Sequence, residues 1–165
     1  MTRSDTFDEF NFTEDTQKGK YLTFYVENEV YGIEIHYVTE IIGVQPFTEV
    51  PEFPPHFRGI INLRGRIVPV MDIRLRFKKD FREYDNRTCI VIIDTDSMSV
   101  GLIVDSVSEV ITIEDEDIVP PPDLNSASPR YLKAIGKVDD SVKLLIDCER
   151  LLSDEDLVAV VDLVN

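Results

Sequence analysis

Apolar side chains alternate with polar ones along most of this chain, and this pattern predicts a series of short β-strands. The clearest case is residues 21–26 followed by residues 30–35, which the polar triplet 27–29 joins into a hairpin. Residues 38–44 fit a short strand and a single helical turn equally well. Further strands are predicted at residues 89–93, 100–104, 107–113, 131–138 and 142–147. The last two would form a hairpin around Asp139 and Asp140.

Two segments have the pattern of a helix start. Asp72 precedes residues 73–79 and is a favoured N-cap residue, with Ile73, Leu75 and Phe77 as candidate packing residues. Ser153 precedes three acidic residues and an apolar run spaced i, i+3, i+4 and i+7, which predicts a C-terminal helix over residues 153–165 that docks on the β body. Many short strands with few helices indicate a mainly β fold of small barrels or sandwiches.

The segment 59–70 places four turn-like residues between two apolar runs. Asn62 suits the first position of a type I turn and Gly65 the fourth, which predicts a three-residue hairpin loop closed by a bulge. Leu63 and Arg64 would then face solvent at the corners, where an arginine offers five donors to a partner. Gly59 and Gly65 are interpreted as backbone requirements of this hairpin rather than as contacts.

The net charge of −15 argues against nucleic acid as a partner. The charge is uneven, because residues 58–87 carry nine of the 17 basic residues and only four of the 32 acidic ones. Either the protein's own acids neutralise this basic segment, or it forms a basic face that meets an acidic partner. No apolar run of about 18 residues and no apolar leader is present, so we expect a cytoplasmic protein without direct membrane insertion.

Residues for catalysis or metal binding are not arranged in any recognisable spacing. His36 and His56 stand apart from each other and from Cys89 and Cys148, which we expect to be free thiols. The acidic run 114–117 lacks the spacing of a calcium loop, and no phosphate loop or nucleophile elbow occurs. The sequence therefore predicts a protein without enzyme activity, metal or cofactor, although a small β-barrel enzyme or metal-binding protein remains an alternative of a different class.

The hairpin segment resembles the Asn-Leu-Arg-Gly signature of the CheW family of chemotaxis coupling proteins. The resemblance covers roughly residues 19–152, and its other motifs lie in residues 21–24, 31–35, 38–41, 68–74 and 101–107. It implies two five-stranded, SH3-like β-barrel subdomains that share an apolar seam, together with short helices and the C-terminal helix. We expect a mobile acidic tail over residues 1–18, a first barrel over 19–83 and a second barrel over 84–152. The polar run 78–87 is interpreted as the hinge between them, and we expect a strand that crosses between the halves.

The resemblance also implies partners and contact residues. The family couples the cytoplasmic tips of chemoreceptors to the regulatory domain of the histidine kinase CheA, so the chain would be a monomer alone and would join arrays at the inner face of the membrane. The residues that match the receptor contact are Asn62, Leu63, Arg64 and Glu40, and the Arg64–Glu40 pair has the alternative role of an internal ion pair. The residues that match the kinase contact are Leu22, Ile35 and Val38, which alternation does not distinguish from core. The same module in a pilus-type or other chemosensory system is the alternative function.

Overall fold

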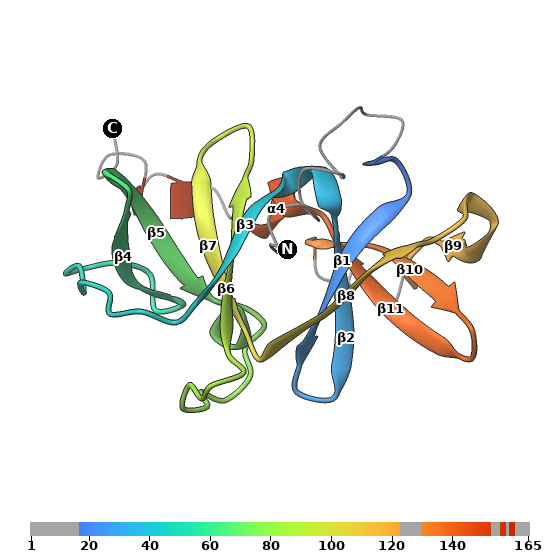
Figure 1. Cartoon of the computed structure of the whole chain (residues 1–165), viewed down its shortest axis with the longest axis horizontal. Coiled ribbons are helices and arrows are strands. Elements are labelled where there is room, and N and C mark those ends of the chain that lie inside the picture. Colours follow the sequence, from blue (N-terminus) through green and yellow to red (C-terminus); the bar gives the residue numbers. More distant parts are fainter. Residues whose placement is uncertain (1–16, 123–129, 153–155, 158, 161–165) are drawn as a thin grey trace, which may run out of the picture.

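The computed structural model describes residues 17–122, 130–152, 156–157 and 159–160. Two curled β-sheets lie side by side along the long axis of the molecule (Figure 1). The first, called here the five-stranded barrel, has the order β3-β6-β7-β5-β4, with β3 (Val38–Gly43), β4 (Phe57–Leu63), β5 (Arg66–Asp72), β6 (Cys89–Asp94) and β7 (Ser99–Val104). The second, the six-stranded barrel, has the order β8-β1-β2-β11-β10-β9, with β1 (Lys20–Val26), β2 (Glu29–Glu34), β8 (Ser106–Thr112), β9 (Ile118–Val119), β10 (Leu132–Val138) and β11 (Ser141–Ile146). The predicted mainly β, two-barrel class is confirmed.

The division of the chain between the barrels differs from the predicted boundary at residue 83. Strands β1 and β2 belong with β8–β11, because β2 pairs in parallel with β11 (Leu144 with Tyr31). The five-stranded barrel is therefore inserted between the first two strands and the last four of the other. The predicted hinge over residues 78–87 is also wrong, since it connects β5 to β6 within one sheet.

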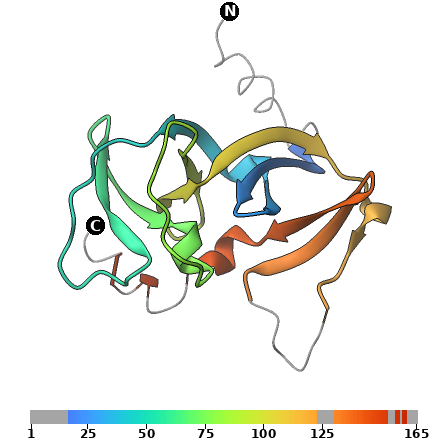
Figure 2. The same ribbon diagram turned by 90° about the horizontal axis from the view of Figure 1, so that it is seen from below.

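Two short segments link the barrels. Residues Ile35–Tyr37 form the 3₁₀-helix η1 between β2 and β3, and Asp105 alone separates β7 from β8. In both ribbon views the β8 strand leads away from the five-stranded barrel into the other one (Figures 1 and 2). The chain thus passes from one barrel to the other twice. As a result the first two strands, β1 and β2, belong to the same barrel as the last four.

The helices from η1 to α4 are short, with three or four residues each. Helix α3 (Ile73–Arg76) begins as predicted at Asp72, whose Oδ1 accepts a hydrogen bond from the Arg74 amide at 2.9 Å. Helix α4 (Cys148–Leu151) is capped in the same way by Asp147, and η2 (Asp115–Asp117) lies in the acidic run. In the predicted C-terminal helix, Asp156, Leu157, Ala159 and Val160 are helical, while its proposed cap Ser153 and the acidic tail up to residue 16 lie outside the described residues. No helix in the described part of the chain is long and apolar enough to cross a membrane.

The largest apolar cluster, called here the seam, lies between the barrels and contains side chains from both of them. It contains Leu22, Phe24 and Ile33 from one and Met71, Val91 and Leu102 from the other. Smaller clusters fill each barrel, one around Val68, Val70 and Ile92 and one around Tyr21 and Leu145. Because burial of apolar area drives folding, this shared seam joins the two barrels into one unit.

Candidate protein-interaction site

The β4–β5 hairpin has a tighter turn than predicted. Leu63 pairs directly with Arg66, so the loop contains only Arg64 and Gly65, both with positive φ (53° and 88°). Two such residues in succession form a type I′ turn, whose twist matches that of the flanking strands. The Asn62 side chain still stabilises the turn, since its Oδ1 accepts a hydrogen bond from the Gly65 amide at 2.8 Å.

The tighter turn changes which side chains face solvent. Arg64 is at the tip with its side chain 73% exposed, whereas Leu63 is 9% exposed and packs inside the five-stranded barrel. The prediction of a solvent-facing Leu63 is therefore wrong, because a two-residue loop leaves Leu63 in the strand with its side chain directed inward. Ile67, which pairs with Asn62 across the hairpin, is 43% exposed instead.

Arg64 is tied to Glu40 of strand β3. Its Nη2 donates hydrogen bonds to both carboxylate oxygens of Glu40, and this hydrogen bonding and charge raise the pKa of Arg64. Strands β3 and β4 are the two edges of the five-stranded sheet, so the pair spans the gap between these edges. The structure thus brings together three of the four predicted receptor-contact side chains, Asn62, Arg64 and Glu40, on one exposed surface.

Gly59 has a separate structural role in the same barrel. The segment after β3 returns to β4, where Thr48 and Ile60 exchange backbone hydrogen bonds of 2.9 Å. A Cβ on Gly59, whose φ is 151°, would lie 2.3 Å from the Thr48 carbonyl oxygen. Only glycine allows this close approach, which closes the edge of the barrel beside the hairpin.

The three residues predicted to contact a kinase are not on the surface. Leu22 and Ile35 are each 2% exposed and Val38 is 5% exposed, and all three belong to the apolar cluster between the barrels. A partner cannot reach these side chains in the folded protein. The prediction of a contact face at Leu22, Ile35 and Val38, which rested on the family resemblance, is therefore wrong: the apolar face on which these residues lie is covered by the other barrel.

The basic segment 58–87 is largely neutralised within the molecule. Five of its basic residues form ion pairs with acidic side chains: Arg64, Arg66, Arg74, Lys79 and Arg82. Arg58 lies over the rings of Phe47 and Phe81, and Arg76 over the ring of Tyr131. Of the two interpretations left open by the sequence, internal neutralisation describes most of this segment.

Groups that could hold a metal or do chemistry are dispersed. Within the described residues there is no cluster of three or more His, Cys, Asp or Glu side chains with metal-binding geometry. The His36 ring lies against that of Tyr37 in a tilted arrangement, and His56 Nε2 lies 3.0 Å from both carboxylate oxygens of Asp156. Cys89 and Cys148 are free thiols, and burial raises the pKa of Cys148.

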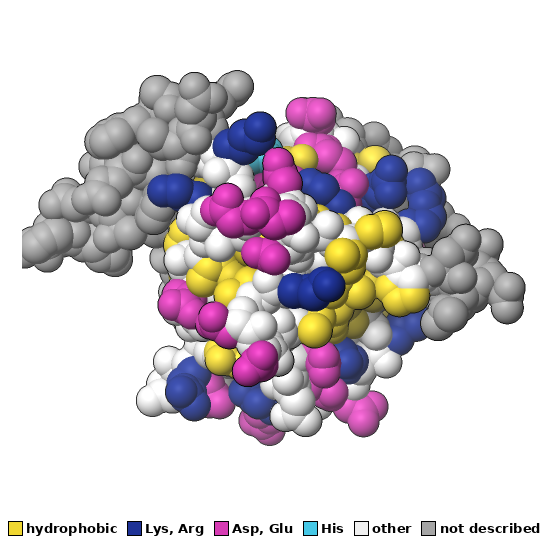
Figure 3. Space-filling model, turned by 90° about the vertical axis from the view of Figure 1, so that its right-hand side faces the viewer, with side chains coloured by type: hydrophobic (Ala, Val, Ile, Leu, Met, Phe, Trp, Pro, Cys, Tyr) yellow, Lys and Arg dark blue, Asp and Glu magenta, His cyan; other side chains and the backbone are white. Residues whose placement is uncertain are grey.

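Two further features of the surface were not predicted. A polar cavity of about 410 Å³ lies beside Asp105, and its lining includes Arg82 and Arg87. At the end of the six-stranded barrel, apolar side chains are exposed among charged ones (Figure 3), and Val142 of β11 is 53% exposed. Val142 could not be distinguished from a core residue by sequence, because it alternates with Lys143 and falls on the same side of the predicted strand as Leu144 and Ile146.

Comparison with known proteins identifies the family. The model of the CheW-like domain matches residues 20–156, which is most of the chain. This chain belongs to the CheW-like family. The chemotaxis protein CheW of Klebsiella aerogenes is 36% identical over 147 residues, covering 88% of this chain and 89% of that protein. The chemotaxis protein CheW of Bacillus subtilis is 32% identical over 137 residues, covering 82% and 88%.

A solved structure supports the same CheW-like assignment. The crystal structure of the scaffolding protein CheW from Thermoanaerobacter tengcongensis superposes with a TM-score of 0.77 at 35% sequence identity. The match covers 84% of this chain and 94% of that protein. The CheW-like fold therefore extends over both barrels, and the Arg64 hairpin lies within the matched family region.

Proposed function

We propose that this chain is a non-catalytic coupling adaptor that joins the cytoplasmic tips of chemoreceptors to the histidine kinase CheA. The observation that carries the proposal is the CheW-like match over residues 20–156, supported by relatives named as chemotaxis proteins and a neighbour described as a scaffolding protein. Two barrels packed on one apolar seam provide a rigid body with separate outer surfaces. Such a body can bind two partners at once and raise their effective concentration for each other. The protein would be a monomer on its own and would join arrays at the inner face of the membrane.

The receptor contact is proposed at the hairpin surface formed by Asn62, Arg64, Glu40 and Ile67. Arg64 supports this choice because it occupies a left-handed conformation that favours Gly or Asn in type I′ turns. An unfavourable backbone conformation at an exposed position is typical of residues retained for function. The adjacent exposed Ile67 adds apolar contact area, and apolar area together with an arginine is typical of interface centres.

A second chemosensory system is the alternative context for the same adaptor. The relatives named chemotaxis protein CheW, at 36% and 32% identity, favour the first proposal.

Co-sedimentation with receptor-containing membranes tests the proposal. We expect the parent protein to increase the amount of CheA in the membrane pellet. The variant Arg64→Glu should weaken this effect by on the order of tenfold, about the value of one lost charge-assisted contact. The control Lys137→Glu makes the same charge change at an exposed position of β10 and should behave like the parent. Equal amounts of CheA with and without the parent protein would contradict the adaptor proposal, while a normal Arg64→Glu variant would contradict only the site.

A further inference from the structure

Helix α3 is attached to the five-stranded barrel at its first turn. Its N-cap Asp72 is almost completely buried, and the Asp72 amide donates to the His56 carbonyl at 2.8 Å. The second carboxylate oxygen of Asp72 accepts a 2.6 Å hydrogen bond from the Tyr84 hydroxyl. Ile73 is also buried. The start of α3 is thus held in place by the barrel from which it emerges.

The side chain of Arg74 leaves α3 and binds the linker between the barrels. Its Nε and Nη2 donate to the two carboxylate oxygens of Asp105, each at 2.8 Å, which is a bidentate pair. Both side chains are mostly buried, with 11% and 13% exposed. Such pairs fix geometry as well as energy, because two parallel hydrogen bonds restrict rotation of either group. Asp105 is the single residue that separates β7 from β8.

Asp105 in turn holds the β1–β2 turn of the six-stranded barrel. Its Oδ2 accepts a 2.7 Å hydrogen bond from the Glu27 amide, and its own amide donates to the Tyr25 carbonyl at 3.0 Å. The Glu27 carboxylate also approaches Arg74 at 3.3 Å and Lys79 at 3.5 Å. One arginine therefore connects the five-stranded barrel, the linker and the β1–β2 turn.

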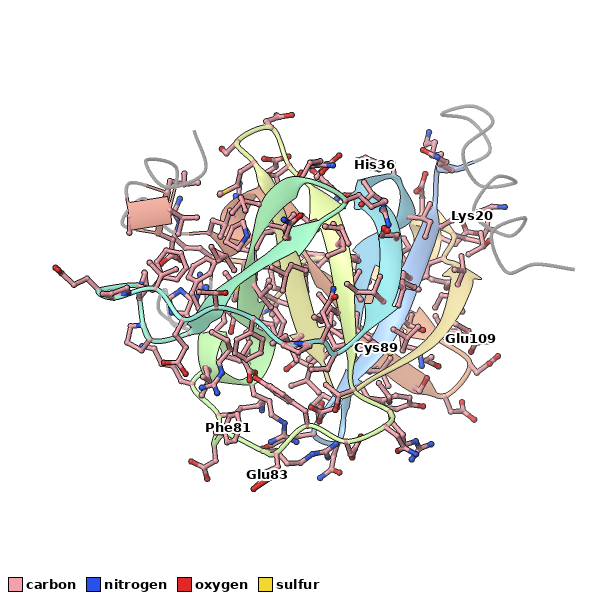
Figure 4. The ribbon with its side chains drawn as sticks, turned by 60° about the vertical axis from the view of Figure 1, so that its left-hand side comes forward. Lys20, His36, Phe81, Glu83, Cys89 and Glu109 are labelled. Carbon is pink, nitrogen blue, oxygen red and sulfur yellow. The ribbon has the colours of Figure 1, made fainter. Side chains whose placement is uncertain are left out.

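The end of α3 makes a second set of contacts with the six-stranded barrel. The ring of Phe77 lies 4.9 Å from that of Tyr31 and 4.6 Å from that of Tyr131, which it stacks on. Arg76 covers the Tyr131 ring at 4.9 Å and donates through Nε to the Leu151 carbonyl at 2.7 Å. The segment that follows α3 carries Phe81 and Glu83 and lies at the end of the molecule opposite His36 (Figure 4).

From these contacts we infer that α3 is a bracket that fixes the angle between the two barrels, with Arg74 and Phe77 as its positioning residues. The bracket matters because the two covalent links, η1 and Asp105, are short single segments. The apolar cluster between the barrels holds them together, but apolar burial is non-directional and does not by itself set their angle. Arg74 restrains the linker itself, and Phe77 restrains the opposite barrel through two rings. This inference rests on the proposed function in one respect: a fixed angle sets the spacing between partners bound on different barrels.

Distance measurement by double electron–electron resonance tests the bracket in the full chain alone. Spin labels are placed at the exposed positions Glu49 and Lys137, one on each side of the seam, after Cys89→Ser. Serine keeps the hydrogen bond that the Cys89 thiol makes to the Arg87 carbonyl, and Cys148 is too buried to react. The parent should give one narrow distance distribution, and Arg74→Met should broaden or shift it. The control Arg66→Met removes an exposed arginine whose ion-pair partner, Asp94, belongs to the same barrel. This variant should leave the distance distribution unchanged.

An Arg74→Met distribution as narrow and centred as that of the parent would overturn the bracket. If Arg74→Met does not fold, Asp105→Asn decides by the same criterion, because it keeps an acceptor for the Glu27 amide while removing the charge. The functional counterpart is that Arg74→Met lowers receptor-dependent kinase activation at least fivefold while affinity for each partner alone stays within twofold. Failure of the parent to bind either partner would contradict the proposed function and leave the distance result standing.

Discussion

Arg64, at the tip of the β4–β5 hairpin, donates hydrogen bonds to both carboxylate oxygens of Glu40 on strand β3. The two residues come from opposite edges of one sheet, so the pair bridges these edges on the same surface that we propose for the receptor. An exposed ion pair of this kind contributes little to stability. We therefore propose that the pair orients the arginine for a partner rather than stabilising the barrel.

Arg64→Gly separates the backbone role of this position from its side-chain role. Glycine adopts positive φ without the steric cost that Arg64 bears, so stability should stay equal or rise by about 1 kcal/mol. Receptor binding should nevertheless fall, because the guanidinium is lost. Urea unfolding measures the first effect and membrane co-sedimentation the second. A large loss of stability would show that Arg64 is structural.

Gly59→Ala should destabilise the five-stranded barrel by about 2–4 kcal/mol. The new Cβ would meet the Thr48 carbonyl oxygen, which a backbone atom cannot easily avoid, and the positive φ adds strain. Gly43→Ala is the matched control, because no atom lies within 4 Å of its Cβ position. Urea unfolding of both variants measures the difference, and equal stabilities would contradict the close approach.

Leu22→Ala should lower the free energy of unfolding by about 2–5 kcal/mol, as expected for truncation of a buried leucine. Val142→Ala removes apolar atoms from an exposed position and should change stability by less than about 0.5 kcal/mol. Chemical denaturation of the two variants distinguishes a core residue from a contact residue. If Leu22→Ala keeps full stability and loses only kinase affinity, the assignment of Leu22 to the core is incorrect.

The contribution of Asp105 to the free energy of unfolding should decrease at acid pH. Burial by itself raises the pKa of Asp105, but the hydrogen bonds from Arg74 and the Glu27 amide outweigh it, so the pKa lies below its usual value. A carboxyl with a lowered folded-state pKa stabilises the protein above its unfolded-state pKa, near 4, and loses this contribution as the pH falls further. Asp105→Asn should therefore flatten the decline in unfolding free energy below about pH 4. Urea unfolding at a series of pH values measures this decline. If the decline below about pH 4 is the same in Asp105→Asn as in the parent, the role of Asp105 is contradicted.

The sequence predicted the strands well because their signal is local. Alternation located the β1–β2 and β10–β11 hairpins, and the cap Asp72 located α3. The division of strands between the barrels was not local, since it depends on β2 pairing with β11 more than 100 residues later. No pattern within either strand encodes that partner.

The candidate site shows the same limit at the scale of single residues. Asn62 and Gly65 indicated a turn, but a three-residue loop and a two-residue loop both place Gly65 at a left-handed position. The choice was made by the pairing of Leu63 with Arg66, which directs Leu63 inward. Leu22, Ile35 and Val38 were assigned by the family resemblance, and alternation could not correct this, because it cannot tell a face covered by the second barrel from a face open to a partner.

The interleaved order of the two barrels has a consequence for synthesis. Strands β1 and β2 leave the ribosome first, yet β11, which completes their sheet, ends at Ile146. The contiguous stretch from Val38 to Val104 can fold while the N-terminal hairpin still waits for its partners. A nascent chain arrested once residue 104 has emerged from the ribosome would thus expose the apolar face of β1 and β2, and chaperones should recognise that stage in particular.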